Sequence, residues 1–271
     1  MNITALEKTA LSVRSLTIDA VEKAKSGHPG LPLGAAELGA ILYGELLRHD
    51  PSDPAWPDRD RFLLSAGHGS MFLYSLLYLS GYKDITLDDI KNFRQVGSRA
   101  AGHPEYGLVD GIEATSGPLG QGIAMSVGFA IAETMLAARF NTASRAIVNH
   151  YTYAFVGDGC LMEGVSGEAS SFAGHHGLGK LIVFYDSNKI TIDGSTELAF
   201  TEDTAKRYEA YGWQVLHGFM YDFEEIAKLT AQAKAETKKP SLIILKSIIG
   251  KGSPHRENTA DAHGAPLGSE E

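Results

Sequence analysis

The stretch YTYAFVGDGCLMEG, residues 151–164, joins a short apolar run to a turn in which an aspartate stands between two glycines. The apolar run, Tyr151–Val156, is typical of a strand buried on both faces of a parallel sheet. In such sheets ligands bind beyond the carboxyl ends of the strands, and glycines there let a phosphate approach the backbone. The stretch therefore predicts an α/β fold with Asp158 in a ligand site at the sheet edge.

A second apolar run, Leu181–Tyr185, ends in the polar segment DSNKI, residues 186–190. If the two strands are neighbours, Asp158 and Asn188 lie close together and offer a carboxylate and a carboxamide oxygen. Hard oxygen ligands of this kind suit Mg²⁺, which keeps further positions for water and phosphate oxygens. GDG alone would be a weak signal, but the two motifs together predict a site for magnesium and a diphosphate cofactor.

The rest of the chain supplies helices and strands around these two runs. Apolar residues at three- and four-residue spacing predict helices, and short apolar runs predict strands. The predicted helices span residues 4–25, 34–47, 67–81, 122–140, 161–175, 203–211 and 223–236. The predicted strands span residues 61–65, 151–156, 181–185 and 242–247. Their alternation indicates an α/β fold, with a parallel sheet flanked by helices, in a single domain over residues 1–271.

Local signals predict where two of these helices begin or end. Thr4 and Glu7 have the spacing of a capping box for the first helix, and Gly27 is expected to end that helix. The acidic pair Glu202 and Asp203 is expected to cap a later helix, because negative charge is favourable at a helix N-terminus.

The composition excludes several classes of protein. The chain carries a net charge of −9, which disfavours nucleic-acid binding. Mean hydropathy is −0.10 and no apolar run approaches the ~20 residues of a spanning helix, so membrane insertion is not expected. The N-terminus lacks a signal-peptide pattern, and a single cysteine, Cys160, excludes an internal disulfide. We therefore expect a cytoplasmic protein in which Cys160 is buried rather than nucleophilic.

Both motifs are parts of a longer pattern that resembles the transketolase family. The strings GDGCLMEG at 157–164 and YDSNKITIDG at 185–194 are similar to the thiamine diphosphate fingerprint of these enzymes. Further similar motifs are SGHPGLPLGAAEL at 26–38, LLSAGHGS at 63–70, GHPEYG at 102–107, TSGPLGQG at 115–122, RYEAYGW at 207–213 and HGAPLG at 263–268. The resemblance covers almost the whole chain and implies a thiamine-diphosphate-binding fold, with Mg²⁺, or a substituting Ca²⁺ or Mn²⁺, as the metal.

This resemblance assigns roles to individual residues. The positions that match metal ligands are Asp158, Asn188 and, through its carbonyl group, Ile190. The positions that match contacts or links to the cofactor are His68, Gly117, Leu119, Gly159, Glu163, Glu168 and Asn188. Among them, His68 matches a diphosphate contact, and Gly117 and Leu119 match the loop against the aminopyrimidine ring. Glu168 matches a glutamate that links two cofactor sites across a dimer interface.

Three histidines match the catalytic histidines of the family, which surround the reactive carbon of the cofactor. These are His28, His103 and His263. The implied chemistry moves protons on hydroxyl groups near neutral pH, where imidazole is the natural proton carrier. The remaining histidines are expected to be structural or have no assigned role, namely His49, His150, His175, His176, His217 and His255.

The activity implied by the resemblance is transfer of a two-carbon ketol group from a ketose phosphate to an aldose phosphate, a transferase reaction of pentose phosphate metabolism. A sulfonated or branched sugar phosphate stays open as an alternative, because segment 251–262 differs from the usual family pattern. A thiamine diphosphate enzyme acting on pyruvate fits less well, since it does not need His103 and His263. A non-catalytic homologue would have no reason to keep the metal motif and these histidines together.

The resemblance reaches only the first of the three domains of a transketolase. The pyrimidine domain, which carries the glutamate that activates the cofactor, has no counterpart in the sequence. Since Met1 stands at the usual start before the first helix, we expect the N-terminal subunit of a split enzyme. A truncated piece is the alternative. Its partner would be a C-terminal subunit, in an α2β2 heterotetramer that takes sugar phosphates. The apolar helices at 67–81 and 122–140 are candidates either for the interface or for the core.

Overall fold

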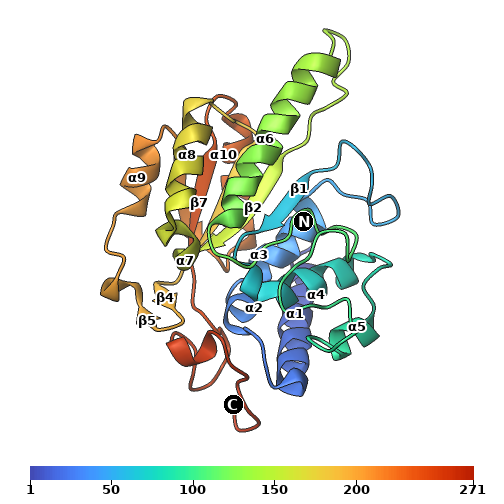
Figure 1. Cartoon of the computed structure of the whole chain (residues 1–271), viewed down its shortest axis with the longest axis vertical. Coiled ribbons are helices and arrows are strands. Elements are labelled where there is room, and N and C mark those ends of the chain that lie inside the picture. Colours follow the sequence, from blue (N-terminus) through green and yellow to red (C-terminus); the bar gives the residue numbers. More distant parts are fainter.

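The computed structural model describes residues 1–271 and places five parallel strands between two layers of helices (Figure 1). The strands are β1 (Arg61–Leu64), β2 (Thr152–Gly157), β3 (Leu181–Ser187), β6 (Gln214–Phe219) and β7 (Ser241–Lys246). Their spatial order is β1-β2-β3-β7-β6, and every neighbouring pair is parallel. The predicted fold class, an α/β fold with a parallel sheet flanked by helices, is confirmed.

Ten helices surround this sheet. They are α1 (Ile3–Ala24), α2 (Gly30–Gly34), α3 (Ala36–Ile41), α4 (Ser70–Ser80), α5 (Leu87–Lys91), α6 (Gln121–Phe140), α7 (Asp158–Met162), α8 (Gly164–His175), α9 (Thr204–Ala210) and α10 (Phe223–Ala235). A small hairpin, β4 (Ile190–Thr191) and β5 (Gly194–Ser195), follows β3. Short 3₁₀ turns cover Gly67–Gly69, Thr196–Leu198 and Ala260–Ala262. Helices α6 and α8 pack together on one face of the sheet, and α10 packs on strands β3, β6 and β7 and on α3.

Strands β2 and β3 are buried along nearly their whole length and set the position of the functional motifs. Gly157 at the end of β2 lies opposite Asp186 near the end of β3. Because the strands are parallel, the residues that follow both strands emerge at the same edge of the sheet. The expectation that Asp158 and Asn188 follow neighbouring strands is therefore correct.

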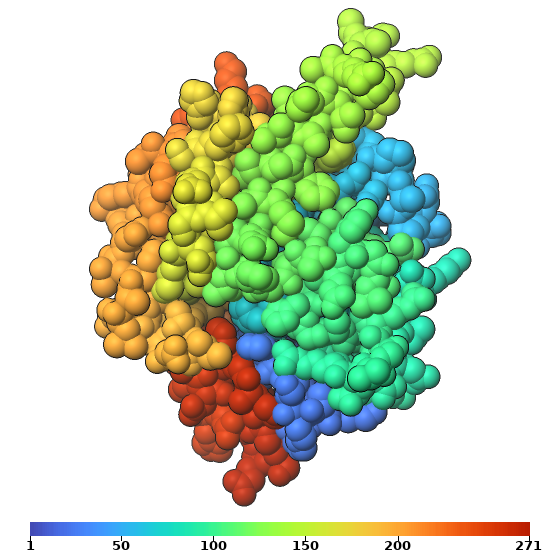
Figure 2. All heavy atoms as spheres, in the orientation of Figure 1, coloured from blue at the N-terminus to red at the C-terminus, as the bar shows by residue number.

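The C-terminal segment returns to the N-terminal turns (Figure 2, red against blue). Leu33, Ala262 and Leu267 form a small apolar cluster of their own. At Gly30 an added Cβ would lie 2.6 Å from the carbonyl oxygen of Ala262, so glycine is required for this close approach. The packing brings the histidine of the HGAPLG motif, His263, next to the segment that carries His28.

The apolar helix α4 is buried in the chain's own core. Phe72, Leu73, Tyr74 and Leu77 are each at most 2% exposed. Burial within the same chain explains why this helix is apolar on nearly all sides, and of its large apolar residues only Leu79, in the last turn, is exposed.

Helix α6 differs from the expectation that no apolar stretch reaches the length of a membrane span. It has 20 residues, and its best 18-residue window has a mean hydropathy of 1.4 and is 28% buried. By length and composition alone it is therefore a candidate span. It also carries a buried carboxylate, Glu133, which pairs with Lys180 at 2.6 Å, and its exposed apolar residues Met135, Leu136 and Phe140 lie in its last turns.

The helix predicted over residues 34–47 is wrong in its continuity. The structure has α2, then α3, then one turn of π-helix over Leu42–Leu46, closed by a bond from the Leu47 amide to the Leu42 carbonyl. Gly34 lies so close to the Ile248 carbonyl that an added Cβ would be 2.7 Å from its oxygen. Glycines in this segment weaken the helix, and contact with the segment after β7 decides its shape.

Both ends of the first helix also differ from the prediction. Asn2 caps α1, because its side-chain oxygen accepts a hydrogen bond from the Ala5 amide at 3.2 Å, while Thr4 lies inside the first turn. The helix ends at Ala24, before Gly27, because Lys25 takes a left-handed conformation with φ 52°. By contrast, Asp203 caps α9 as expected, accepting from the Lys206 amide.

Two further elements differ from the prediction. Strand β6, with the sequence QVLHGF, was missed because an edge strand with one open side does not need the apolar run of a central strand. The helix predicted over 161–175 is two helices, α7 and α8, separated by Glu163 in an extended conformation with ψ 137°. Strands β1, β2, β3 and β7 lie within a residue or two of their predicted ends.

Candidate active site at the carboxyl edge of the sheet

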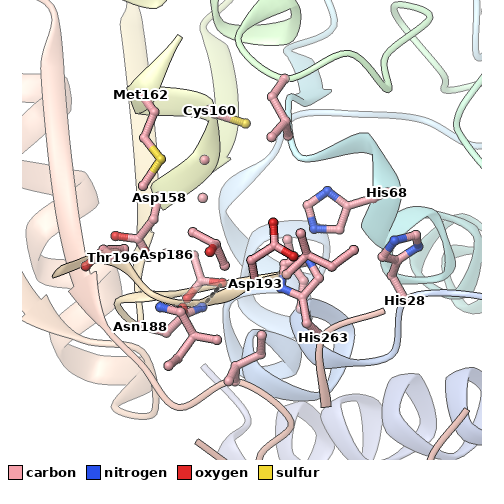
Figure 3. A pocket seen from close by; sticks show the side chains of 18 of the residues that line it. His28, His68, Asp158, Cys160, Met162, Asp186, Asn188, Asp193, Thr196 and His263 are labelled. Carbon is pink, nitrogen blue, oxygen red and sulfur yellow. Dashed lines mark hydrogen bonds between the residues drawn. The ribbon is translucent and has the colours of Figure 1, made fainter. Parts of the chain in front are cut away.

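A cavity of about 470 Å³ opens at the carboxyl ends of β2 and β3. Of the residues singled out from the sequence, those that line it are His28, His68, Gly117, Leu119, Asp158, Gly159, Glu163, Asn188, Ile190 and His263. They come from segments far apart in the chain. Figure 3 shows Asp158, Asp186 and Asn188 on one side of the cavity and the three histidines on the other, with Asp193 close to His263.

Two of the sequence-predicted residues do not line the cavity. His103 is exposed and lies against Gly117, where an added Cβ would be 3.2 Å from the imidazole Cδ2. It therefore stands beside the cavity wall. Glu168 is exposed on α8, in the layer that covers the sheet.

The carboxylate of Asp158 is held by two donors. The hydroxyl of Tyr185 donates to Oδ1 at 2.5 Å, and the backbone N–H of Lys189 donates to Oδ2 at 3.0 Å. Lys189 takes a left-handed conformation with φ 62°, unusual for a non-glycine residue, within the DSNKI turn that supplies this N–H. Burial raises the pKa of Asp158, and these hydrogen bonds act in the opposite direction.

The carboxamide of Asn188 is fixed at both ends. Its Nδ2 donates to Asp186 Oδ2 at 3.1 Å, and its Oδ1 accepts from the Ile190 amide at 2.9 Å. Asp186 is 2% exposed and also accepts a hydrogen bond from the hydroxyl of Ser247, which directly follows β7. Burial raises the pKa of Asp186 to about 7.

Sequence reasoning missed the residues that hold the ligands. From the sequence, Tyr185 is only the end of an apolar run, Asp186 only the first residue of the polar segment that follows it, and Ser247 only the end of another apolar run. A carboxylate inside an apolar strand is itself a signal, because a buried charge needs partners. The hydrogen bond from Ser247, which directly follows β7, depends on β7 lying beside β3, and a local stretch of sequence does not show this strand order.

The donors at the end of the sheet fit a hard divalent cation with a diphosphate. Asp158, Asn188 and the Ile190 carbonyl offer oxygens only, and no group of three or more His, Cys, Asp or Glu side chains is arranged so that it could hold a metal ion by itself. Such a set leaves coordination positions for water and phosphate oxygens, as Mg²⁺ prefers. An added Cβ at Gly159 would lie 2.9 Å from Leu119 Cδ1, so a side chain there would intrude on the cavity wall.

Three imidazole rings gather on the opposite wall. The ring centroids of His28 and His68 are 5.1 Å apart, those of His68 and His263 are 5.1 Å apart, and those of His28 and His263 are 5.9 Å apart. Burial, followed by neighbouring positive charge, lowers the pKa of His28 to about 4 and that of His68 to about 3. Burial also lowers the pKa of His263. All three rings are therefore neutral near pH 7.

Three of the six remaining histidines have partners that fit a structural role. His49 contacts the hydroxyl of Tyr82 and the carbonyl of Tyr43, and His150 lies 3.4 Å from Asp58. His255 pairs with Glu271 at 3.0 Å. These three residues lie outside the cavity.

Cys160 lines the cavity but is poorly suited to act as a nucleophile. It is fully buried, and the hydroxyl of Ser65 lies 3.4 Å from its sulfur. Burial raises the pKa of its thiol, whereas reactive cysteines have a lowered pKa. Its position agrees with the expectation of a buried residue.

Comparisons with known proteins give a consistent result. A family described as "Transketolase, thiamine diphosphate binding domain" matches residues 6–271. The chain is 70% identical to a transketolase of Treponema pallidum over 264 residues, which is 97% of this chain and 40% of that protein. It is 57% identical to a transketolase of Nostoc over 98% of this chain. The chain thus spans about 40% of the length of these curated relatives.

Solved structures agree with the sequence relatives. The transketolase of Leishmania mexicana superimposes with a TM-score of 0.95 at 52% identity, covering 98% of this chain and 40% of that one. A transketolase of Pichia stipitis in complex with sedoheptulose 7-phosphate superimposes with a TM-score of 0.96 at 49% identity, covering 98% and 39%.

Proposed function

Because the chain belongs to the transketolase family, as a thiamine diphosphate-binding domain, we propose that it supplies the diphosphate and metal half of a transketolase active site. The observation that carries this proposal is the cavity in which Asp158 and Asn188 face the three neutral histidines. We propose that residues 1–271 act as a single domain. The reaction would be transfer of a two-carbon ketol group from a ketose phosphate to an aldose phosphate.

In this proposal the wall at the ends of β2 and β3 holds the metal and the diphosphate. Asp158, Asn188 and the Ile190 carbonyl bind Mg²⁺, and Gly159 and Glu163 line the diphosphate position. Tyr185 and Asp186 orient the metal ligands through the hydrogen bonds described above. His68 contacts the diphosphate, Gly117 and Leu119 pack against the aminopyrimidine ring, and Glu168 links two sites across a dimer interface.

In this proposal the histidines bind the sugar substrate. When bound, thiamine diphosphate supplies a carbon nucleophile and an electron sink for breaking a carbon–carbon bond beside a carbonyl group. His28, His103 and His263 would hydrogen-bond the sugar's oxygens and move protons between them. Neutral rings suit this role because each offers one N–H donor and one acceptor nitrogen. The buried Nδ1 of His263 has no partner within the chain, which leaves it free for a ligand.

We propose that the activity needs a second polypeptide, a C-terminal transketolase subunit, in an α2β2 heterotetramer. Two observations support a partner at the site. The relatives are more than twice as long as the aligned region, and Ile192 and Leu198, which line the cavity, are 60% and 76% exposed. Apolar side chains at a cavity rim are typical of surface that another protein covers.

The substrate proposal goes no further than sugar phosphates. Transketolase structures of Pichia stipitis contain sedoheptulose 7-phosphate, fructose 6-phosphate or xylulose 5-phosphate. No observation favours a sulfonated or branched sugar. We propose a cytoplasmic location together with this activity.

The test is an assay with xylulose 5-phosphate, ribose 5-phosphate, thiamine diphosphate and Mg²⁺. The chain is assayed alone and mixed with a pyrimidine-domain chain from the same source. Activity in the mixture, and its loss in Asp158→Ala, would support the proposal. The variant Asp193→Ala, which removes another carboxylate of the same cavity, is the control. Magnesium-dependent cofactor binding that survives Asp158→Ala would contradict the metal assignment.

A further inference from the structure

Arg94 lies beside the histidine wall in an unusual conformation. It is one of four non-glycine residues with positive φ, at 60°, and its amide closes a loop by donating to the Ala100 carbonyl at 2.9 Å. Such a conformation costs energy in a residue with a side chain and is often found at functional sites. The loop carries the guanidinium to His28, which lines the cavity.

The guanidinium of Arg94 is committed to two neighbours. Nη1 donates to the hydroxyl of Ser26 at 2.7 Å, and Nη2 lies 3.2 Å from Nδ1 of His28. No carboxylate pairs with Arg94 within the chain, and its Nε is buried without a partner. The charge therefore acts on the histidines rather than on an acid, and it contributes to the lowered pKa values of His28 and His103.

The contact between Arg94 and His28 fixes the position of a proton. A guanidinium carries five N–H donors and no acceptor, so the bond forms only when Nδ1 of His28 offers a lone pair. A neutral imidazole then carries its proton on Nε2. An added Cβ at Gly264 would lie 3.3 Å from Nε2, so this nitrogen lies next to the HGAPLG segment, and the His28 residue itself lines the cavity.

We propose that Arg94 is a positioning residue that holds His28 in the tautomer with the proton on Nε2, so that His28 donates a hydrogen bond to a ligand oxygen in the cavity. In the ketol transfer proposed above, the ligand oxygen belongs to the sugar, and this part rests on the proposed function. The assignment of the His28 tautomer does not depend on the proposed function. His28 therefore acts as a donor and orienting group, and proton acceptance falls to another histidine.

The direct test is a nitrogen–proton correlation spectrum of the full chain labelled with ¹⁵N-histidine. The His28 signals are assigned from their loss in His28→Gln. The wild-type chain should give the pattern of the Nε2–H tautomer, and Arg94→Met should give a mixture with Nδ1–H. Arg99→Met, which removes an exposed arginine of the same loop, should leave the pattern unchanged.

Two results would overturn the proposal. One is an Nδ1–H tautomer of His28 in the wild-type chain, a result that needs no variant to fold. The other is an unchanged Nε2–H pattern in Arg94→Met. Should Arg94→Met not fold, Ser26→Ala, which loosens the guanidinium, takes its place and should raise the Nδ1–H population.

A kinetic test on the complex with the C-terminal subunit separates positioning from general structure. Arg94→Lys keeps the charge but loses the planar fork, so kcat/KM for the ketose should fall about tenfold to hundredfold, the worth of one charge-assisted hydrogen bond. Cofactor affinity should stay within about twofold, since this bond does not involve the metal site. Equal losses of kcat/KM and of cofactor affinity would argue against a positioning role for Arg94. If the complex lacks transketolase activity while the tautomer is as expected, the proposed function fails and the positioning role stands.

Discussion

The phenol of Tyr185, at the end of β3, donates a 2.5 Å hydrogen bond to Oδ1 of Asp158, which follows β2. The bond joins two neighbouring strands at the point where a metal ligand must be held. A carboxylate that is oriented before the metal arrives binds it with less loss of side-chain freedom. Tyr185, a residue of β3, thus fixes the orientation of the carboxylate that follows β2.

We expect Tyr185→Phe to lower the affinity for Mg²⁺ with thiamine diphosphate about tenfold, by freeing the Asp158 carboxylate. Calorimetry on the complex with the C-terminal subunit measures this. The matched control is Tyr153→Phe, because the buried hydroxyl of Tyr153 has no hydrogen-bond partner and its loss should leave cofactor affinity unchanged. An unaltered affinity in Tyr185→Phe would show that Asp158 is oriented by other contacts.

His263→Ala should lower the turnover of the complex about hundredfold or more while leaving cofactor affinity nearly unchanged. The reason is that His263 lies on the wall opposite the metal ligands, where the sugar is expected. Steady-state kinetics and cofactor titration measure the two effects separately. His255→Ala, outside the cavity, should change neither, and a His263 variant with equal losses of both would indicate a structural role.

The sequence predicts the polar turns of the site more directly than it predicts the contacts that support these turns. Asp158 and Asn188 are each placed by a local pattern, an apolar strand followed by a short turn, and such a pattern is complete within a dozen residues. The bond between Ser247 and Asp186 depends on β7 lying beside β3. That order arises only when the whole sheet forms, so no window of sequence contains it.

The same distinction explains the errors in the fold. Central strands such as β2 and β3 are recognisable because both faces are buried, whereas the half-polar β6 at the sheet edge is not. The link from Arg94 to His28 spans 66 residues and rests on a left-handed arginine, a conformation that residue type does not predict. Functional residues in loops are hard to predict from the sequence when tertiary packing decides their backbone conformation.

The stability of the domain should fall as the pH is lowered from neutral. In the folded chain, burial lowers the pKa of His68 from 6.5 to about 3, so the unfolded chain binds the proton and the folded chain does not. The stabilising effect is complete above about pH 6.5 and is lost progressively below it. His28, whose pKa burial lowers to about 4, acts in the same direction, whereas Asp186, whose pKa burial raises to about 7, stabilises the folded chain as it takes up a proton. Because the two histidines together outweigh the one carboxyl group, thermal unfolding between pH 7 and pH 5 should show a Tm that decreases by a few degrees.

Substitution of single histidines shows which residue causes the decrease in Tm. His68→Gln should flatten the decrease in Tm, because a neutral side chain takes up no proton on unfolding. His217→Gln, at an exposed position of β6, should leave the slope as in the wild type. A slope that is the same in both variants would assign the pH dependence to other groups.

Lys180→Met should destabilise the domain by about 3 kcal/mol, because it leaves the carboxylate of Glu133 buried on α6 without its partner. The two side chains form a 2.6 Å ion pair, with Glu133 3% and Lys180 31% exposed, and the access of water to Lys180 keeps the cost at the lower end of the range for buried pairs. Urea unfolding at pH 7 measures the change.

Two comparisons decide whether this pair fixes α6 to the sheet. The double variant Lys180→Met with Glu133→Met should recover most of the lost stability, since two apolar side chains replace the ions. Lys206→Met, which removes an exposed pair with Asp203, should leave stability nearly unchanged. Because burial raises the pKa of Glu133, the defect of Lys180→Met should also shrink as the pH falls and the carboxyl group takes up a proton. A defect that persists unchanged in acid would place its cause in lost packing of the lysine stem rather than in the buried charge.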